Sequence, residues 1–74
     1  MTEYKPSPIM KFFKFDHLPE HLQAPSRTFH AVASWVDQNL PEGAEKATAL
    51  RKLLEGKDCA VRAAIDLKKV EDLA

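Results

Sequence analysis

The amino-acid sequence predicts an all-α fold: an antiparallel helical hairpin, preceded by a short kinked helix and an extended arm. Two observations predict this fold. Apolar residues recur at steps of three and four along two stretches, and a five-residue turn with both proline and glycine, residues 39–43, separates them. The one short apolar run near the N-terminus has no second strand candidate to pair with, so we expect no sheet.

The first predicted helix follows a segment with two helix-start signals. Asp16 is placed to cap a short first turn that has Pro19 near its beginning. Pro25 then interrupts or kinks this turn, and Ser26 is placed to cap the main helix, residues 26–38. The predicted apolar stripe consists of Leu22, Phe29, Val32, Val36 and Leu40, with Ala31 and Trp35 in a flanking stripe. One neighbouring helix would not cover so broad an apolar surface.

The second predicted helix spans residues 44–67, where good helix formers are frequent. Its two predicted apolar faces consist of Ala47, Leu50, Leu54, Val61 and Ile65, and of Leu53, Ala60, Ala64 and Leu67. Gly56 in mid-helix costs about 1 kcal/mol relative to alanine. Either another backbone approaches closely there, or the position is exposed and tolerates glycine.

The predicted organisation is an extended or flexible arm over residues 1–14, a hairpin domain over residues 15–67, and a charged tail over residues 68–74 that is either a fraying last turn or disordered. The two prolines within residues 4–8 favour extended backbone in the arm. Three phenylalanines interleaved with lysines follow within residues 9–15. We expect this run to dock on the hairpin as an extended segment, with at least two of these phenylalanines in the core.

Composition excludes several classes of protein. The 74 residues include 11 basic and 11 acidic side chains, and a net charge of zero argues against a protein that coats nucleic acid. A single cysteine cannot form an internal disulfide, and no apolar run or signal-peptide pattern predicts a membrane span or secretion. A domain this small hides only roughly 60% of its unfolded surface. We therefore predict self-association, which would cover the broad apolar faces.

Enzyme chemistry, a metal and a cofactor are not expected. His17 and His21 flank Glu20 at a spacing that suits zinc, but zinc sites need three or four ligands, and we favour two surface histidines. Cys59 would be a nucleophile only beside a histidine, and we favour an ordinary helix residue. Two glycines are too few for a glycine-rich phosphate loop.

The basic residues of the second helix allow two interpretations. They are Lys46, Arg51, Lys52, Lys57 and Arg62. One interpretation is a solvated face with weak ion pairs, since Arg51 lies four residues before Glu55. The other is that some of them converge across a subunit interface on a small anion, because the arginine fork suits phosphate. The lysine- and phenylalanine-rich run likewise either anchors the arm or stacks on nucleobases.

Three stretches of the chain resemble one family of small tailed-phage proteins. They are residues 15–23 (FDHLPEHLQ), 40–43 (LPEG) and 45–63 (EKATALRKLLEGKDCAVRA). They are similar to a helical hairpin domain shared by two groups of immune-evasion sponges, directed against CBASS and Thoeris signalling. The resemblance covers about residues 15–64, and its most specific part is the ALRKLLE run with the KD and AVRA that follow it.

This resemblance implies a homo-oligomer, a hexamer in the anti-CBASS members, with cyclic dinucleotides and in some members cyclic trinucleotides bound uncleaved between subunits. Such a protein lowers the free messenger in the host cytoplasm and keeps the host effector inactive. The family stacks an aromatic side chain on a base, and the matching candidates here are Tyr4, Phe13 and Phe15. Its phosphate contacts match Arg27, Lys46, Arg51 and Arg62, and its base or ribose contacts match Thr28 and His30.

Two other hypotheses come from different classes. The alternative is a phage adaptor or inhibitor that lays its broad apolar faces on a host protein. A small helical DNA-binding regulator is the third, and the lack of a basic stripe argues against it.

Overall fold

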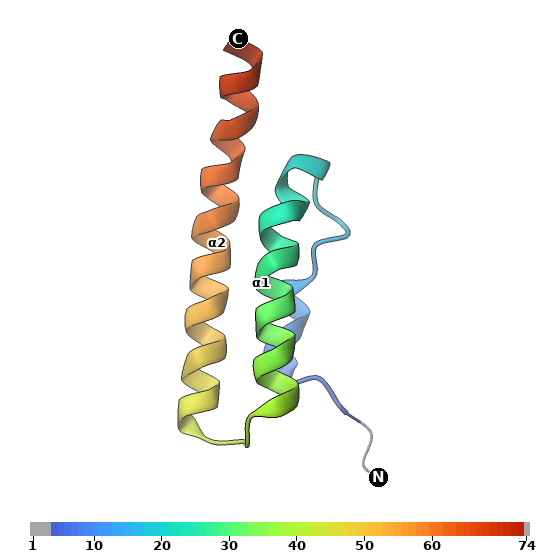
Figure 1. Cartoon of the computed structure of the whole chain (residues 1–74), viewed down its shortest axis with the longest axis vertical. Helices are drawn as coiled ribbons and strands as arrows, with labels where there is room; N and C mark the ends of the chain where they lie inside the picture. The colour runs from blue at the N-terminus through green and yellow to red at the C-terminus, as the bar shows by residue number, and fades with distance from the viewer. Residues whose placement is uncertain (1–3, 74) are drawn as a thin grey trace.

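The structure, a computed structural model, describes residues 4–73. It contains a 3-10 helix, η1 (Pro8–Phe13), and two α-helices, α1 (Glu20–Asn39) and α2 (Ala44–Leu73). The two α-helices run antiparallel side by side, and η1 packs against both of them (Figure 1). Because residues 4–73 contain no strand, the predicted all-helical hairpin is confirmed.

The inner face of each α-helix follows steps of four and three residues, the spacing of a single helix face. On α1 the buried or half-buried members are Leu22, Ser26, Phe29, Ala33, Val36 and Asp37. On α2 they are Lys46, Leu50, Leu53, Lys57, Ala60 and Ala64. Four of these inner positions are therefore polar or charged, which an apolar pattern cannot reveal.

The predicted apolar stripes are wrong at several positions for this reason. Val32 is 46% exposed and Trp35 is 60% exposed, and both lie on the side of α1 turned away from the core. Ala47 and Ile65 on α2 are also exposed. The core forms around Met10, Phe13, Ala33 and Leu50, and the predicted stripe residues Phe29, Val36, Leu53 and Leu54 pack against it. Asp37, Lys46 and Lys57, which are bonded inside the fold, occupy neighbouring inner positions, whereas the buried Ser26 hydroxyl has no hydrogen-bond partner among the described residues.

The segment expected to be extended forms η1 instead. A 3-10 helix has three residues per turn, so Met10 and Phe13 lie on the same side and both are buried. Phe12 points elsewhere and is 54% exposed, while Phe15 is half-buried. One phenylalanine of the three, rather than two, is wholly in the core.

Both α-helices are longer than predicted. Pro25 lies inside α1, so the predicted interruption at this residue is wrong. The φ of proline suits a helix, but in the second turn its ring removes one backbone hydrogen bond and crowds the carbonyl of residue 21, a cost that the packing of α1 against α2 and η1 outweighs. α2 continues to Leu73 and so includes most of the predicted tail. Residues 1–3 of the arm and residue 74 of the tail lie outside the described residues.

The molecule is elongated, with extents of 52 × 22 × 15 Å. Its radius of gyration is 14.4 Å, whereas a compact domain of this length has about 11 Å. α2 has 30 residues and α1 has 20, so α2 extends about 15 Å beyond its partner (Figure 1). Within residues 4–73, none of the helices combines the length and the hydropathy needed to cross a bilayer.

Candidate functional site

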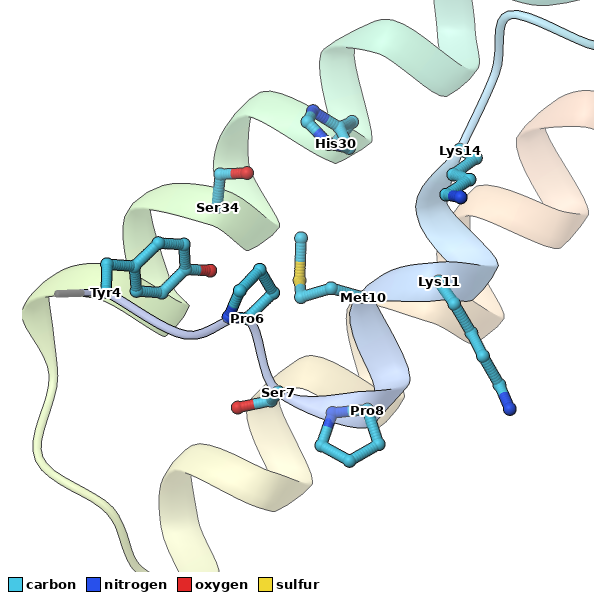
Figure 2. Close-up of a pocket in the computed structure, with 9 residues that line it drawn as sticks. All are labelled: Tyr4, Pro6, Ser7, Pro8, Met10, Lys11, Lys14, His30 and Ser34. Carbon is cyan, nitrogen blue, oxygen red and sulfur yellow. The ribbon is translucent and has the colours of Figure 1, made fainter.

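A groove of about 580 Å³ lies between the N-terminal segment and α1 (Figure 2). Its lining residues are Tyr4, Pro6, Ser7, Pro8, Met10, Lys11, Lys14, His30 and Ser34. The proline rings, the tyrosine ring and the methionine thioether make most of this lining apolar. None of the nine residues carries a carboxylate.

The polar groups of the groove come from α1 and from the residues around η1. His30 and Ser34 are one turn apart on α1 and face the groove in Figure 2. Lys11 extends away from the groove, and its Nζ lies 5.0 Å from the centroid of the Phe12 ring. Lys14 is exposed and makes no hydrogen bond or ion pair with the described residues. The amine of Lys14 is therefore the cation at the groove that is available to a ligand.

The N-terminal wall of the groove is held by one buried carboxylate. Asp37 accepts hydrogen bonds from the Tyr4 hydroxyl at 2.5 Å, the Ser7 hydroxyl at 2.5 Å and the Ser7 backbone N–H at 2.9 Å. Lys46 lies 3.5 Å from the same carboxylate and donates to the Asp37 backbone carbonyl at 2.8 Å. We call Tyr4, Ser7, Asp37 and Lys46 the Asp37 anchor.

The contacts within the Asp37 anchor shift the pKa values of Asp37, Tyr4 and Lys46. Burial by itself raises the pKa of Asp37, but the hydrogen bonds from Ser7 and Tyr4 and the charge of Lys46 outweigh it and lower the pKa to about 2. Burial, together with the hydrogen bond to Asp37, raises the pKa of Tyr4 to about 12. A hydrogen bond to Glu42, at 2.6 Å, raises the pKa of Lys46. The carboxylate is therefore ionised and the phenol neutral across the physiological pH range.

A second group of side chains adjoins the groove through His30. The Phe15 ring meets the His30 ring edge-on, with 5.5 Å between centroids. The guanidinium carbon of Arg27 lies 5.4 Å from the centroid of the Phe15 ring. His30 lines the groove together with Tyr4. The structure thus brings Tyr4, Phe15, Arg27 and His30 to one continuous surface, although they lie up to 26 residues apart in the chain.

The other five predicted ligand residues lie elsewhere or are occupied. Phe13 is wholly buried, so a base cannot stack on it without repacking the core. Lys46 is 7% exposed, and its amine is already bonded within the protein. The Thr28 hydroxyl donates to the Ala24 carbonyl at 3.0 Å. Arg51 is exposed on α2, and exposed Arg62 donates to the Cys59 sulfur at 3.3 Å.

Sequence reasoning missed Ser34 and Asp37, and it considered Lys14 only as part of the lysine- and phenylalanine-rich run. The lysines among the phenylalanines were a visible signal for Lys14. Asp37 follows Ala33 by four residues on an inner helix face, and an acidic residue in that position indicates a buried partner. Ser34 carries no comparable signal, because its role depends on the wall that residues 4–8 build beside it.

The described residues offer little for metal or nucleophile chemistry. Within residues 4–73, no three His, Cys, Asp or Glu side chains are gathered as a metal ion would require. His17 is exposed and His21 half-buried. Cys59 is an exposed free thiol rather than a buried residue.

Comparisons with known proteins find no relative: no family model, no curated protein and no solved structure matches this chain. The properties of its own surface are therefore the evidence on its function.

Proposed function

We propose that this protein is a bacteriophage immune-evasion sponge, which binds cyclic oligonucleotide messengers of antiphage defence in the host cytoplasm and sequesters them uncleaved. The observation that carries the proposal is the convergence of four predicted ligand residues on one surface: Tyr4, Phe15, Arg27 and His30. The resemblance of residues 15–64 to the sponge family gives this surface its expected ligand.

The chemistry of these side chains suits a cyclic oligonucleotide. Stacking of a base on an aromatic ring contributes about 1–3 kcal/mol, and Phe15 is half-buried, so one part of its ring remains accessible. Arg27 lies beside that ring and supplies the planar donor fork that phosphate prefers. Sequestration needs only tight binding and enough copies of the protein, so no catalytic group is required.

Assembly into a homo-oligomer is part of the proposal. Several large apolar side chains are exposed in the single chain: Phe12, Val32, Trp35, Leu40 and Ile65. The elongated shape leaves further surface that the chain itself does not cover. Other copies would cover it, and native mass spectrometry is expected to give the mass of a hexamer. A monomer at micromolar concentration would contradict this part of the proposal.

Isothermal titration calorimetry tests the binding directly. We expect one or more cyclic di- or trinucleotides to bind, and mass spectrometry of the released ligand to show it intact. Arg27→Gln should weaken binding roughly tenfold, since it removes a charge-assisted phosphate contact. Lys52→Gln is the matched control, because Lys52 is exposed and pairs only with Glu55, at 3.6 Å. Lack of binding across a panel that includes cyclic ADP-ribose isomers, at tens of micromolar, would refute the proposal.

A host-protein adaptor is the second candidate, and the outer face of α1 favours it. Val32 and Trp35 are exposed on this face, and residues 28–36 contain no Asp, Glu, Lys or Arg. Large exposed apolar patches of this kind mark protein contacts. Recovery of one stoichiometric host protein without bound nucleotide, lost on Trp35→Ala, would favour the adaptor over the sponge.

A further inference from the structure

We propose that the groove between residues 4–14 and α1 is a preformed site for a small organic anion, whose planar apolar part lies on the groove floor and whose charge lies beside Lys14. The proposal concerns Lys14 and the apolar floor of the groove, which consists of Tyr4, Pro6, Pro8 and Met10. It stands independently of the sponge function, since the anion need not be a cyclic oligonucleotide.

The floor is built for an apolar group. Pro6 and Pro8 present rigid rings, Tyr4 adds an aromatic ring, and the thioether of Met10 lies between them and α1 (Figure 2). Small-molecule sites are mostly apolar with a few polar groups, and their volumes are roughly 300–1,000 Å³. The groove, at about 580 Å³, falls within that range. Methionine adapts its shape to such a ligand, because it is unbranched and polarizable.

The charges around the floor favour an anion. No carboxylate lines the groove, and the one carboxylate that holds its wall, Asp37, is already paired with Lys46. Lys14 is left without an acidic partner in the described part of the chain. Ser34 and His30 add groups on α1 that can hydrogen-bond to a ligand. The Lys14 amine and the polar side chains of His30 and Ser34 surround an apolar floor. This arrangement suits an organic anion rather than a cation.

Both ends of the N-terminal segment are fixed, so the groove exists before a ligand arrives. The three hydrogen bonds to Asp37 hold Tyr4 and Ser7 at the beginning of the segment. At its end, Lys57 donates to the Phe12 carbonyl at 2.6 Å. A ligand therefore does not have to order this wall, and the free energy of binding is not reduced by that ordering.

Fluorescence titration with anilinonaphthalene sulfonate tests the proposal, because this probe joins planar rings to one anionic group. Phenylnaphthylamine, which has the same rings without the sulfonate, is the matched neutral probe. We expect the sulfonate to bind saturably, and Lys14→Gln to weaken it about threefold to tenfold while leaving the neutral probe unchanged. Ser34→Leu, which fills the groove from α1, should weaken both probes more than roughly tenfold.

Two control variants separate the groove from other surfaces. Lys52→Gln removes an exposed lysine that does not line the groove, and Trp35→Gln removes the largest exposed apolar side chain of α1. Both should leave sulfonate binding unchanged. The proposal is overturned if Ser34→Leu has no effect, if Trp35→Gln abolishes binding, or if Lys14→Gln weakens the two probes equally.

The role of the wall is tested with Asp37→Asn, with circular dichroism to check that the helices remain. Release of the wall should weaken binding of both probes, and unchanged binding would show that the groove is not built by this carboxylate. If Asp37→Asn loses its helical signal, Ser7→Ala removes one wall hydrogen bond in the folded protein and gives the same test. A protein that binds the sulfonate but no cyclic oligonucleotide would refute the sponge function and leave this inference intact.

Discussion

Each end of the N-terminal segment is held at a site that contains a buried lysine, but only Lys57 contacts the segment itself, and the two lysines have very different surroundings. Lys46, 7% exposed, belongs to the Asp37 anchor, where two carboxylates and a backbone carbonyl surround its amine. Lys57, 9% exposed, donates only to the Phe12 carbonyl in the described part of the chain. We call Lys57 and this carbonyl the Lys57 anchor.

This difference shows how burial of a charge is tolerated in a small fold. At the Asp37 anchor, removal of Asp37 takes one of two carboxylates away from the buried Lys46 amine, which is costly. At the Lys57 anchor no opposite charge is left behind when the lysine is removed. We therefore expect the N-terminal segment to depend much more on the Asp37 anchor, and the following predictions test that contrast.

The largest expected effect is that of Asp37→Ala. This substitution removes three hydrogen bonds to Tyr4 and Ser7 and leaves Lys46 with Glu42 as its only carboxylate. The free energy of unfolding should fall by about 3 kcal/mol, measured by urea denaturation. A loss below about 1 kcal/mol would mean that the anchor contributes no more than an ordinary hydrogen bond.

A pH titration of stability should show the same anchor. The pKa of Asp37 is lowered from 3.8 to about 2 in the folded protein, so its ionised form stabilises the fold. That stabilisation is complete above pH 4 and is lost as the pH falls through the folded pKa near 2, with a change of at most about 2 kcal/mol. The difference in unfolding free energy between the wild type and Asp37→Asn should therefore shrink over this interval. A difference that is constant with pH would contradict the assignment.

Lys57→Met should have a smaller effect. It removes one hydrogen bond, to a carbonyl at the partly exposed end of η1, while it keeps most of the apolar stem volume. We expect a loss of about 1 kcal/mol in the same urea experiment. If the loss equals that of Asp37→Ala, the contrast between the two anchors is wrong.

Alanine substitutions of the two glycines should change stability least. Gly43 lies three residues before Lys46 of the Asp37 anchor, and Gly56 directly precedes Lys57. An alanine Cβ at Gly43 would meet nothing within 4 Å, and no glycine in residues 4–73 has a positive φ, so Gly43→Ala should stabilise by about 0.5 kcal/mol. At Gly56 the Cβ would lie 3.1 Å from the Phe29 ring, which has to move by a few tenths of an ångström. Gly56→Ala gains about 1 kcal/mol in helix propensity, and the displacement of the Phe29 ring should cancel most of that gain. A thermal unfolding midpoint that rises more for Gly56→Ala than for Gly43→Ala would contradict this ranking.

The close approach at Gly56 illustrates how far sequence reasoning reached. Of the two interpretations of this glycine, the structure supports the close approach, but the neighbour is the Phe29 side chain rather than a backbone. The spacing of apolar residues located the helices, whereas it did not identify which polar residues lie inside. Lys57 on α2 and Ser26 on α1 occupy inner positions that an apolar pattern assigns to solvent.

The candidate site was predictable only in part. The aromatic and basic residue types near Phe15 were visible in the sequence, and their contact with Arg27 and His30 required the fold. The groove itself was not predictable, because its wall belongs to a segment whose prolines favour extended backbone locally. That wall takes its position from hydrogen bonds that join residues 30 and 33 positions apart in the chain.

The sequence by itself determined the hairpin, because helical periodicity and a proline- and glycine-containing turn are local properties that act within a few residues. The tertiary structure decided what the hairpin encloses and where a groove opens. Burial of a charged side chain is costly unless it finds partners, and Asp37 finds two of its partners, Tyr4 and Ser7, near the beginning of the chain. Lys46 is in the interior because the fold places Asp37 and Glu42 beside its amine, whereas Lys14 meets no acidic partner in the described part of the chain and remains available to a ligand.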